Sequence, residues 1–385
     1  MVSHPAPSDE TASIHETSLA GEASSTVDKE VDGKKVPSRG NRCVRFLRGA
    51  LAWSLWAYLI FLVVLMPVFR VGGDHYWWAT LFLYAPRVLY GFPFLIFVLA
   101  MFLLGWRRHQ LVLLLIAFFL WFFPIAGFNI PWRTAFAWDA SDSIKILTCN
   151  VFGITGDRDM LSDLIRESDV DLVGLQEHDE EHPPVDWPKG WYHRHYNELA
   201  VGSRWPILRT EIHKRKFPPD TFPLENAMYC VIDSPAGPIG FATVHLSSPR
   251  EPILGVFDRR TVIDPSKIGP LKHSIRLRRS ESAEVIRWLE QFPEPKIIVG
   301  DLNLVDDSSI FLDTWARYAD AFHYAGFGLG ITKKTRIPCF GSTFGTRIDY
   351  ILLGPRFRPV SCRIGPTVIS DHYPVIGEVD VVEEE

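Results

Sequence analysis

The sequence predicts a mixed α/β domain preceded by three transmembrane helices. Long apolar runs fill residues 42–132, whereas short β-type runs alternate with helical stretches after residue 143. Charge separates the same regions, because the net charge is −3 in residues 1–41, +7 in residues 42–138 and −9 in residues 139–385. A chain divided this sharply consists of three regions rather than one blended domain.

Residues 1–41 form the first region, and we expect a disordered tail there. The segment contains no Phe, Trp or Tyr and is dominated by Ser, Thr, Glu, Ala and Gly. Such a composition cannot bury enough apolar surface to offset the entropy lost on ordering. No apolar run begins within the first 40 residues, so the segment does not resemble a signal peptide.

Residues 42–132 form the membrane region, with predicted spans at about 49–69, 76–105 and 111–130. The first and third spans carry no charge, which disfavours a soluble helical bundle. Arg87 interrupts the second run. We expect the membrane helix to begin after Arg87, with the side chain snorkelling to the interface, and an intramembrane functional site is the alternative.

Basic residues determine the expected orientation of the membrane region. Six of them precede the first span: Lys34, Lys35, Arg39, Arg42, Arg45 and Arg48. Arg107 and Arg108 separate the second and third spans, whereas the first loop holds only Arg70, balanced by Asp74. The positive-inside rule therefore places the N-terminus in the cytoplasm. Three crossings predict an integral protein of the plasma or inner membrane with an extracytoplasmic domain, joined through a connector at 133–142.

Residues 143–380 form the predicted domain, followed by an acidic tail at 381–385. We expect strands at 144–150, 170–176, 228–233, 239–245, 296–300, 347–353 and 375–379, and helices at 158–168 and 277–291. The Pro- and Gly-containing stretch 234–238 is typical of a hairpin turn between two of these strands.

Polar side chains lie at or just after the predicted strands. They are Asn150, Glu177, His245, Asp301, Asn303, Asp349, Asp371 and His372. Strand-end loops gather at one rim of a sheet, where a site can assemble. Singly, these residues are ordinary caps and turns, but eight in order favour a site. Four carboxylates, two His and two Asn suit Mg²⁺ or Mn²⁺, and the five cysteines lack zinc-site spacing.

Six short motifs resemble those of the endonuclease/exonuclease/phosphatase superfamily, the group of DNase I. They are Thr148-Cys-Asn150, Leu175-Gln-Glu177, Thr243-Val-His245-Leu246, Gly300-Asp-Leu-Asn303, Arg347-Ile-Asp349-Tyr350 and Ser370-Asp-His372. The resemblance implies a four-layer α/β sandwich of two packed, mixed sheets with helices outside, the DNase I-like fold. The layout with preceding membrane helices resembles membrane-anchored bacterial members.

The resemblance also implies metal-assisted hydrolysis of phosphodiesters and a set of metal-binding residues. Glu177 is expected to be the main metal ligand, with Asn150 supporting the metal or the phosphate and Asp371 contributing. Asp301 resembles the family's water-positioning base or a second metal ligand. Asn303 is expected to hold a phosphate oxygen.

The two histidines complete the implied catalytic set. His372 resembles the histidine at the phosphate, and Asp349 is expected to hydrogen-bond it, which fixes its tautomer and raises its pKa. His245 lies where DNase I-like and sphingomyelinase-like members carry His and abasic-site endonucleases carry Tyr. General acid assistance to the leaving group is its expected role, and a hydrogen bond within the rim is the alternative.

Three functions follow from the resemblance, with a nuclease placed first on the family's base rate. A phospholipid or other phosphoester hydrolase of the sphingomyelinase type is the alternative, and a non-enzymatic membrane protein is the third. The expected partners are the lipid bilayer and a phosphodiester substrate, either nucleic acid or phospholipid. The basic segment 250–279 is expected to be a long loop that steers an anionic substrate or is merely solvated. A smaller cluster, Lys333, Lys334 and Arg336, has the same two interpretations.

Overall fold

The computed structural model describes residues 39–132, 143–152, 159–179, 183–215, 225–257, 268–336, 343–368 and 370–382. Contacts divide the chain into two compact units, Met1–Phe46 and Leu47–Glu385. Nearly all of the predicted tail, the whole of the predicted connector at 133–142 and residues 383–385 lie outside the described ranges.

Among the described residues, three helical stretches are long and apolar enough to cross a membrane: Arg42–Gly72, Arg87–Leu104 and Arg108–Ile125. They comprise α1 (Arg39–Pro67) with η1 (Val68–Gly72), η2 (Arg87–Gly91) with α3 (Phe92–Leu104), and α4 (Arg108–Leu120) with η3 (Trp121–Ile125).

The predicted second span is interrupted near its start. Residues 77–84 form a separate short helix, α2 (Trp77–Tyr84), and the chain is extended at Ala85 before Pro86. Proline lacks an amide hydrogen and disfavours helical geometry in the preceding residue, which separates α2 from the helix that follows it. The second apolar helical stretch therefore begins at Arg87, close to the expected start after Arg87, and is shorter than the predicted span at 76–105. The residues between the first two apolar stretches, 73–86, are called the 73–86 segment below.

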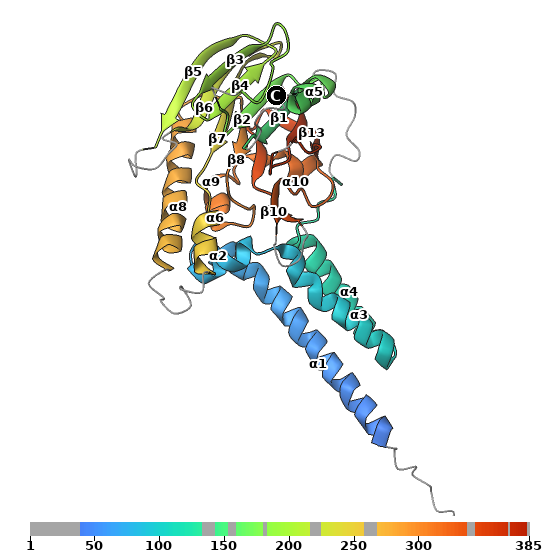
Figure 1. Cartoon of the computed structure of the whole chain (residues 1–385). Helices are drawn as coiled ribbons and strands as arrows, with labels where there is room; N and C mark the ends of the chain where they lie inside the picture. The colour runs from blue at the N-terminus through green and yellow to red at the C-terminus, as the bar shows by residue number, and fades with distance from the viewer. Residues whose placement is uncertain are drawn as a thin grey trace, which may run out of the picture. The chain divides into compact units, whose positions relative to one another are not determined.

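Two six-stranded sheets form the core of the domain (Figure 1). The first contains β13 (Phe357–Ile364), β14 (Val375–Val381), β1 (Ser143–Asn150), β2 (Leu172–Gln176), β4 (Leu199–Ser203) and β3 (Tyr192–Tyr196). The second contains β5 (Ile207–Lys214), β6 (Glu225–Ser234), β7 (Gly237–His245), β8 (Lys296–Asp301), β12 (Asp349–Leu353) and β9 (Ala319–Asp320). A ribbon of β10 (Lys333–Arg336) and β11 (Thr343–Thr346) is separate.

Alternating side chains on these strands build four layers. Ile146 of β1 and Ile297 of β8 face the core between the sheets. Leu147 faces outward onto α5 (Asp159–Glu167), and Ile298 faces outward onto α8 (Gly269–Leu289). This helix–sheet–sheet–helix order, with mixed strand directions, confirms the predicted four-layer sandwich.

The basic segment 250–279 is not a long loop in its described parts, so that expectation was wrong. It contains α6 (Arg250–Val256) and the first half of α8, whereas residues 258–267 lie outside the described ranges. Helix α8 begins eight residues before the predicted position because Pro270 suits a first turn and Leu271 and Ile275 continue the buried face. Two short helices, α9 (Ser309–Thr314) and α10 (Ala321–Ala325), follow β8 and β9.

Candidate active site

One parallel pair of strands in each sheet carries the site residues to a common edge. Strands β1 and β2 run parallel and end opposite each other at Asn150 and Gln176. Strands β7 and β8 run parallel and end at His245 and Asp301. Carboxyl ends of neighbouring parallel strands lie on the same side of a sheet, which is where α/β proteins place their ligands.

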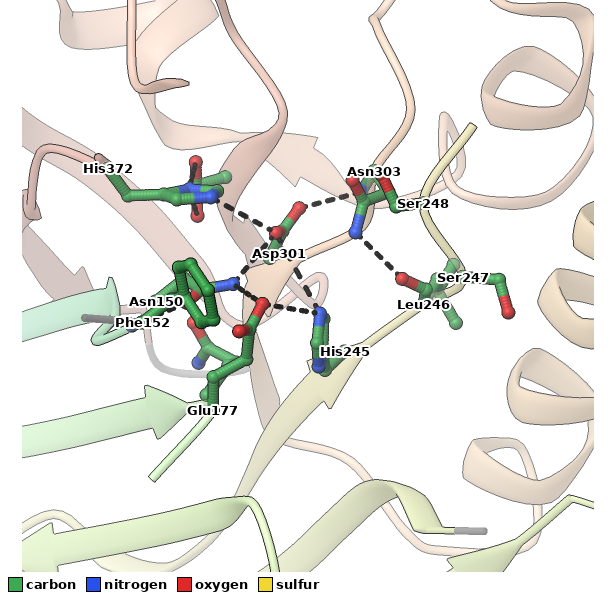
Figure 2. Close-up of polar contacts among 12 residues, drawn as sticks. Asn150, Phe152, Glu177, His245, Leu246, Ser247, Ser248, Asp301, Asn303 and His372 are labelled. Atoms are coloured by element: carbon green, nitrogen blue, oxygen red, sulfur yellow. Dashed lines mark hydrogen bonds and ion pairs between the residues drawn. The ribbon is translucent and has the colours of Figure 1, made fainter. Parts of the chain in front are cut away.

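An amide and two carboxylates meet at this edge (Figure 2). The Asn150 Nδ2 donates to Glu177 Oε1 at 2.8 Å and to Asp301 Oδ2 at 3.1 Å. His245 approaches the same oxygens, with Nε2 3.5 Å from Glu177 Oε1 and 4.0 Å from Asp301 Oδ2. Side chains from both sheets therefore converge on one point.

His372 lies on the other side of Asp301 and is held by Asp349. Its Nδ1 lies 2.9 and 3.0 Å from the two Asp349 carboxylate oxygens, so the predicted hydrogen bond between them is present. Its Nε2 lies 3.6 Å from Asp301 Oδ2. Ser370 supports the arrangement, because its hydroxyl accepts from the His372 amide and donates to the Asn150 carbonyl.

Asn303 closes the turn after β8. Its backbone amide donates to Asp301 Oδ1 at 2.8 Å, and its side-chain Nδ2 donates to the Leu246 carbonyl at 2.7 Å. The turn therefore ties the strand end at Asp301 to the chain that follows His245.

Asp371 lies at the margin of the site. Its Oδ2 pairs with Lys333 Nζ at 2.6 Å, and its Oδ1 lies 3.9 Å from His372 Nε2. Lys334 Nζ donates a hydrogen bond to the Ser370 carbonyl and lies over the Tyr373 ring. The two lysines of the small basic cluster thus have intramolecular partners, and a metal-binding role for Asp371 stays a prediction.

Three site positions have left-handed or glycine-type backbone geometry. Glu177 has φ 54° and Asn303 has φ 51°, an uncommon conformation for residues with side chains. Gly300 has φ 132°, and a Cβ there would lie 2.1 Å from the Val244 carbonyl oxygen. Such geometry persists where the surrounding structure enforces it, and it directs the Glu177 and Asp301 side chains into the site.

The electrostatic environment raises the pKa values of three site residues. Burial and the charge of Asp349 raise the pKa of Asp301 to about 6. Burial opposes protonation of His372, but Asp349 and Asp301 outweigh it and raise the pKa of His372 to about 9. Burial likewise opposes protonation of His245, yet the nearby carboxylates, Glu198 first among them, raise its pKa.

Two residues of the site were not singled out from the sequence. The buried amide of Gln176 donates to Thr148 Oγ1 at 3.1 Å and to Thr243 Oγ1 at 2.8 Å, and so joins the two sheets below the site. Its only signal was its place beside Glu177. Glu198 Oε2 lies 3.7 Å from His245 Nδ1, and its position between two strands that were not predicted gave no signal.

The donor set has the chemistry of a divalent-cation site. Asp301, Asp349 and His372 hold ligand atoms within 4.8 Å of one another, and Glu177 adds a carboxylate beside Asp301. Asp349 and His372 are paired with each other, which leaves Asp301 and Glu177 as the residues that would hold an ion. Asp301 is nearly fully buried among further acids, so a bound cation would offset charge that the side chains themselves leave in excess. Oxygen ligands of this kind suit Mg²⁺ or Mn²⁺.

The family assignment comes from a match over residues 147–372 to the model of the Endonuclease/Exonuclease/phosphatase family. The chain belongs to this family. Members of the family are hydrolases that act on phosphoester bonds. The matched region runs from β1 to His372 and contains every site residue described above.

Several solved structures are similar to the domain. The D. rerio TDP2 complex with a single-strand DNA product is 16% identical, with 62% of this chain and 100% of that chain covered and a TM-score of 0.45. A Bacteroides thetaiotaomicron family protein is 15% identical, with 63% and 96% covered and a TM-score of 0.47. The Neisseria 3' phosphatase NExo bound to a product DNA hairpin is 15% identical, with 62% and 99% covered and a TM-score of 0.46. A search of curated proteins finds no match.

Proposed function

We propose that this hydrolase is a membrane-anchored phosphodiesterase that depends on a divalent metal ion. The observation that carries the proposal is the convergence of Glu177, Asp301 and Asn150 beside a histidine fixed by Asp349. Phosphodiester hydrolysis needs stabilisation of the developing phosphate charge, removal of a proton from water and neutralisation of the leaving oxygen. The residues at this edge can serve each of these needs.

Glu177 and Asp301 are the residues that would hold the metal ion, with Asn150 orienting both carboxylates. When bound, the ion supplies Lewis-acid stabilisation of the phosphate oxygens. Asp301, with a pKa of about 6, is ionised at neutral pH. If Glu177 alone holds the ion, Asp301 can instead orient the attacking water and accept its proton.

The histidines would act on the phosphate and the leaving group. His372 is protonated at neutral pH, and Asp349 holds its Nδ1, so its Nε2 is free to donate to a phosphate oxygen. His245 also has a raised pKa and lies next to the Glu177 carboxylate, where it can donate a proton to the leaving oxygen.

Anchoring in the membrane is supported by the three apolar helical stretches. The expected orientation, with a cytoplasmic N-terminus and an extracytoplasmic domain, rests on the distribution of Lys and Arg around these stretches. Both belong to the proposal, together with the division into a tail (1–41), a membrane region (42–132), a connector (133–142) and a catalytic domain (143–380).

For the substrate, a nuclease is the first candidate from the family resemblance, and one observation favours a phospholipid as the second. A cavity of about 300 Å³ is lined both by the ends of two apolar helical stretches and by the domain. Arg87 and Trp121 line it from the membrane side, and Val305 and Arg347 line it from chain segments next to the site. A substrate held in the bilayer surface would meet the domain near its active site.

Hydrolysis of bis(p-nitrophenyl) phosphate by the full chain in detergent tests the reaction without assuming a natural substrate. We expect hydrolysis with Mg²⁺ or Mn²⁺, none with EDTA, and a loss of about 10²–10⁴-fold for His372→Ala. His193→Ala is the matched control, because His193 lies on the exposed strand β3. A folded protein that hydrolyses nothing, or a fully active His372→Ala variant, contradicts the proposal.

The same preparation separates the two substrate classes. Supercoiled plasmid DNA and phospholipid vesicles are incubated with the enzyme and Mg²⁺, each with the His372→Ala variant alongside. Nicking that depends on His372 identifies a nuclease, whereas release of a headgroup that depends on His372 identifies a lipid phosphodiesterase.

A further inference from the structure

The 73–86 segment packs on the loop that follows Asp301. Ser309 Oγ donates to the Gly73 carbonyl at 2.6 Å, and Arg70 and Arg87, at the two ends of the segment, both pair with Asp307. Apolar side chains continue the contact, since Val305 and Ile348 belong to the same buried cluster as the membrane helices. Membrane-proximal residues therefore support the loop of residues 302–309.

A fully buried ion pair lies at the centre of this contact. Arg278 Nη2 on α8 lies 2.6 Å from Asp74 Oδ1, and neither side chain is exposed to solvent. The neighbouring Arg279 Nη2 donates to the Asp74 carbonyl at 3.1 Å, and the Ser308 hydroxyl donates to the Asp74 carboxylate. Buried pairs of this kind add little net stability but fix one relative arrangement of the elements that they join.

Tyr84 extends this network to the site. Its hydroxyl accepts a hydrogen bond from Arg278 Nη1 at 2.7 Å and donates to the backbone carbonyl of Asn303 at 3.1 Å. The guanidinium also lies 5.3 Å from the centre of the Tyr84 ring. One phenol thus connects the buried ion pair with a residue of the proposed active site.

The Tyr84 contact can influence the orientation of the Asp301 carboxylate through Asn303. It has a left-handed backbone, and its amide donates to Asp301 Oδ1 while its carbonyl accepts from Tyr84. A rotation of this residue would move the donor that orients the Asp301 carboxylate. Displacements well below an ångström at a reacting group cost rate, because the reacting atoms must be aligned.

We infer that Tyr84 is a positioning residue for catalysis, through which the membrane region holds the 302–309 loop in its active geometry. The inference rests on the proposed function, because it needs Asp301, which Asn303 orients, to act in catalysis. It makes the 73–86 segment a part of the catalytic apparatus as well as a link between membrane spans.

Tyr84→Phe in the full chain tests this inference, with Tyr58→Phe as the matched control. Tyr58 donates its hydroxyl to the Tyr90 carbonyl at 2.7 Å, so the control loses an equivalent hydrogen bond within the membrane helices. With bis(p-nitrophenyl) phosphate and Mg²⁺, we expect kcat of Tyr84→Phe to fall about fivefold with KM unchanged. Tyr58→Phe should keep the kcat of the wild type.

Hydrogen exchange provides a second readout that does not depend on activity. Backbone amides of residues 302–305 should exchange faster in Tyr84→Phe than in the wild type or in Tyr58→Phe. Unchanged kcat and unchanged exchange in Tyr84→Phe would overturn the inference, as would equal losses of kcat in both variants. An inactive wild type would instead overturn the proposed function, so the two failures are distinguishable.

Discussion

Two buried ionic clusters lie on either side of Asn303, and they differ in charge balance. At the site, Glu177, Asp301 and Asp349 crowd around two histidines, and burial together with the charge of Asp349 raises the pKa of Asp301. The second cluster, called the membrane contact below, joins the 73–86 segment to α8. There the carboxylate of Asp74 pairs with the guanidinium of Arg278, and the hydroxyls of Tyr84 and Ser308 bond to the pair. An unbalanced cluster suits the binding of a cation, whereas a balanced one suits the fixing of two elements.

The largest expected effect comes from unbalancing the membrane contact. Asp74→Asn keeps the shape of the side chain but leaves Arg278 buried without its counter-ion, so we expect the free energy of unfolding to fall by about 3–5 kcal/mol. Asp313→Asn is the control, because Asp313 pairs with Arg279 at the surface, where such pairs contribute about 1 kcal/mol or less. Unfolding midpoints of both variants and the wild type, measured in the same detergent, compare the two effects. Equal decreases for Asp74→Asn and Asp313→Asn would contradict the prediction.

The second prediction concerns pH. Between about pH 5 and pH 10, pH should change metal affinity and activity at the site but should not change the ionisation of Tyr84 and Arg278 at the membrane contact. Metal binding needs ionised Asp301, so affinity for Mn²⁺ should weaken about tenfold per pH unit below its pKa of about 6. Activity should fall again above pH 9, because His372 then loses its proton. Burial raises the pKa of Tyr84, and Asp74 holds the pKa of Arg278 high against burial, so neither titrates in this range.

Calorimetric titration with Mn²⁺ between pH 5 and pH 8 measures the loss of affinity at low pH. Rates between pH 6 and pH 10 measure the loss of activity at high pH. The same titration affects folding, because the raised pKa of His372 contributes stability below pH 6.5 that is lost as the pH rises through about 9. Affinity that does not change between pH 5 and pH 7 would show that Asp301 is not a ligand.

The smallest effect is expected at the margin of the site. Lys333→Met removes the partner of Asp371 from a pair that is partly exposed, so activity at pH 7 should change less than about fivefold. Lys333 lowers the pKa of His372, so its loss should move the alkaline limb to higher pH. Rates across that limb measure the shift, and a loss above 100-fold would indicate direct contact between Lys333 and the substrate.

The sequence predicted the site better than the contact beside it, for a physical reason. Asn150, His245 and Asp301 each end an apolar strand, and that local pattern is visible without knowing any tertiary contact. Asp74 was counted only as a charge that balances Arg70 in the loop between two spans, and Arg278 as part of a basic segment that steers substrate or is merely solvated. Their pairing joins residues 204 positions apart, which no local pattern encodes.

The same limit explains the missed elements. Strand β3, Tyr192–Tyr196, is exposed at every position and so lacks the alternation that marks a half-buried strand. Arg87 was expected to lie at the start of a membrane helix with its side chain at the interface, which stays a prediction. Its partner was not predicted, because Nη1 lies 2.8 Å from Asp307 Oδ2, an acid in the distant loop after β8. A side chain whose partner is distant in the sequence has no local pattern that marks the pair, so such pairs could not be predicted.

The separation between Asp74 and Arg278 has a consequence for biogenesis. The chain is synthesised from its N-terminus, so the 73–86 segment leaves the ribosome roughly 200 residues before its counter-ion does. During that interval the Asp74 carboxylate lacks the Arg278 guanidinium that pairs with it in the folded chain, so its charge has to stay hydrated. Burial of the pair therefore waits for α8, so packing of the 73–86 segment against the domain is a late event in the maturation of the chain.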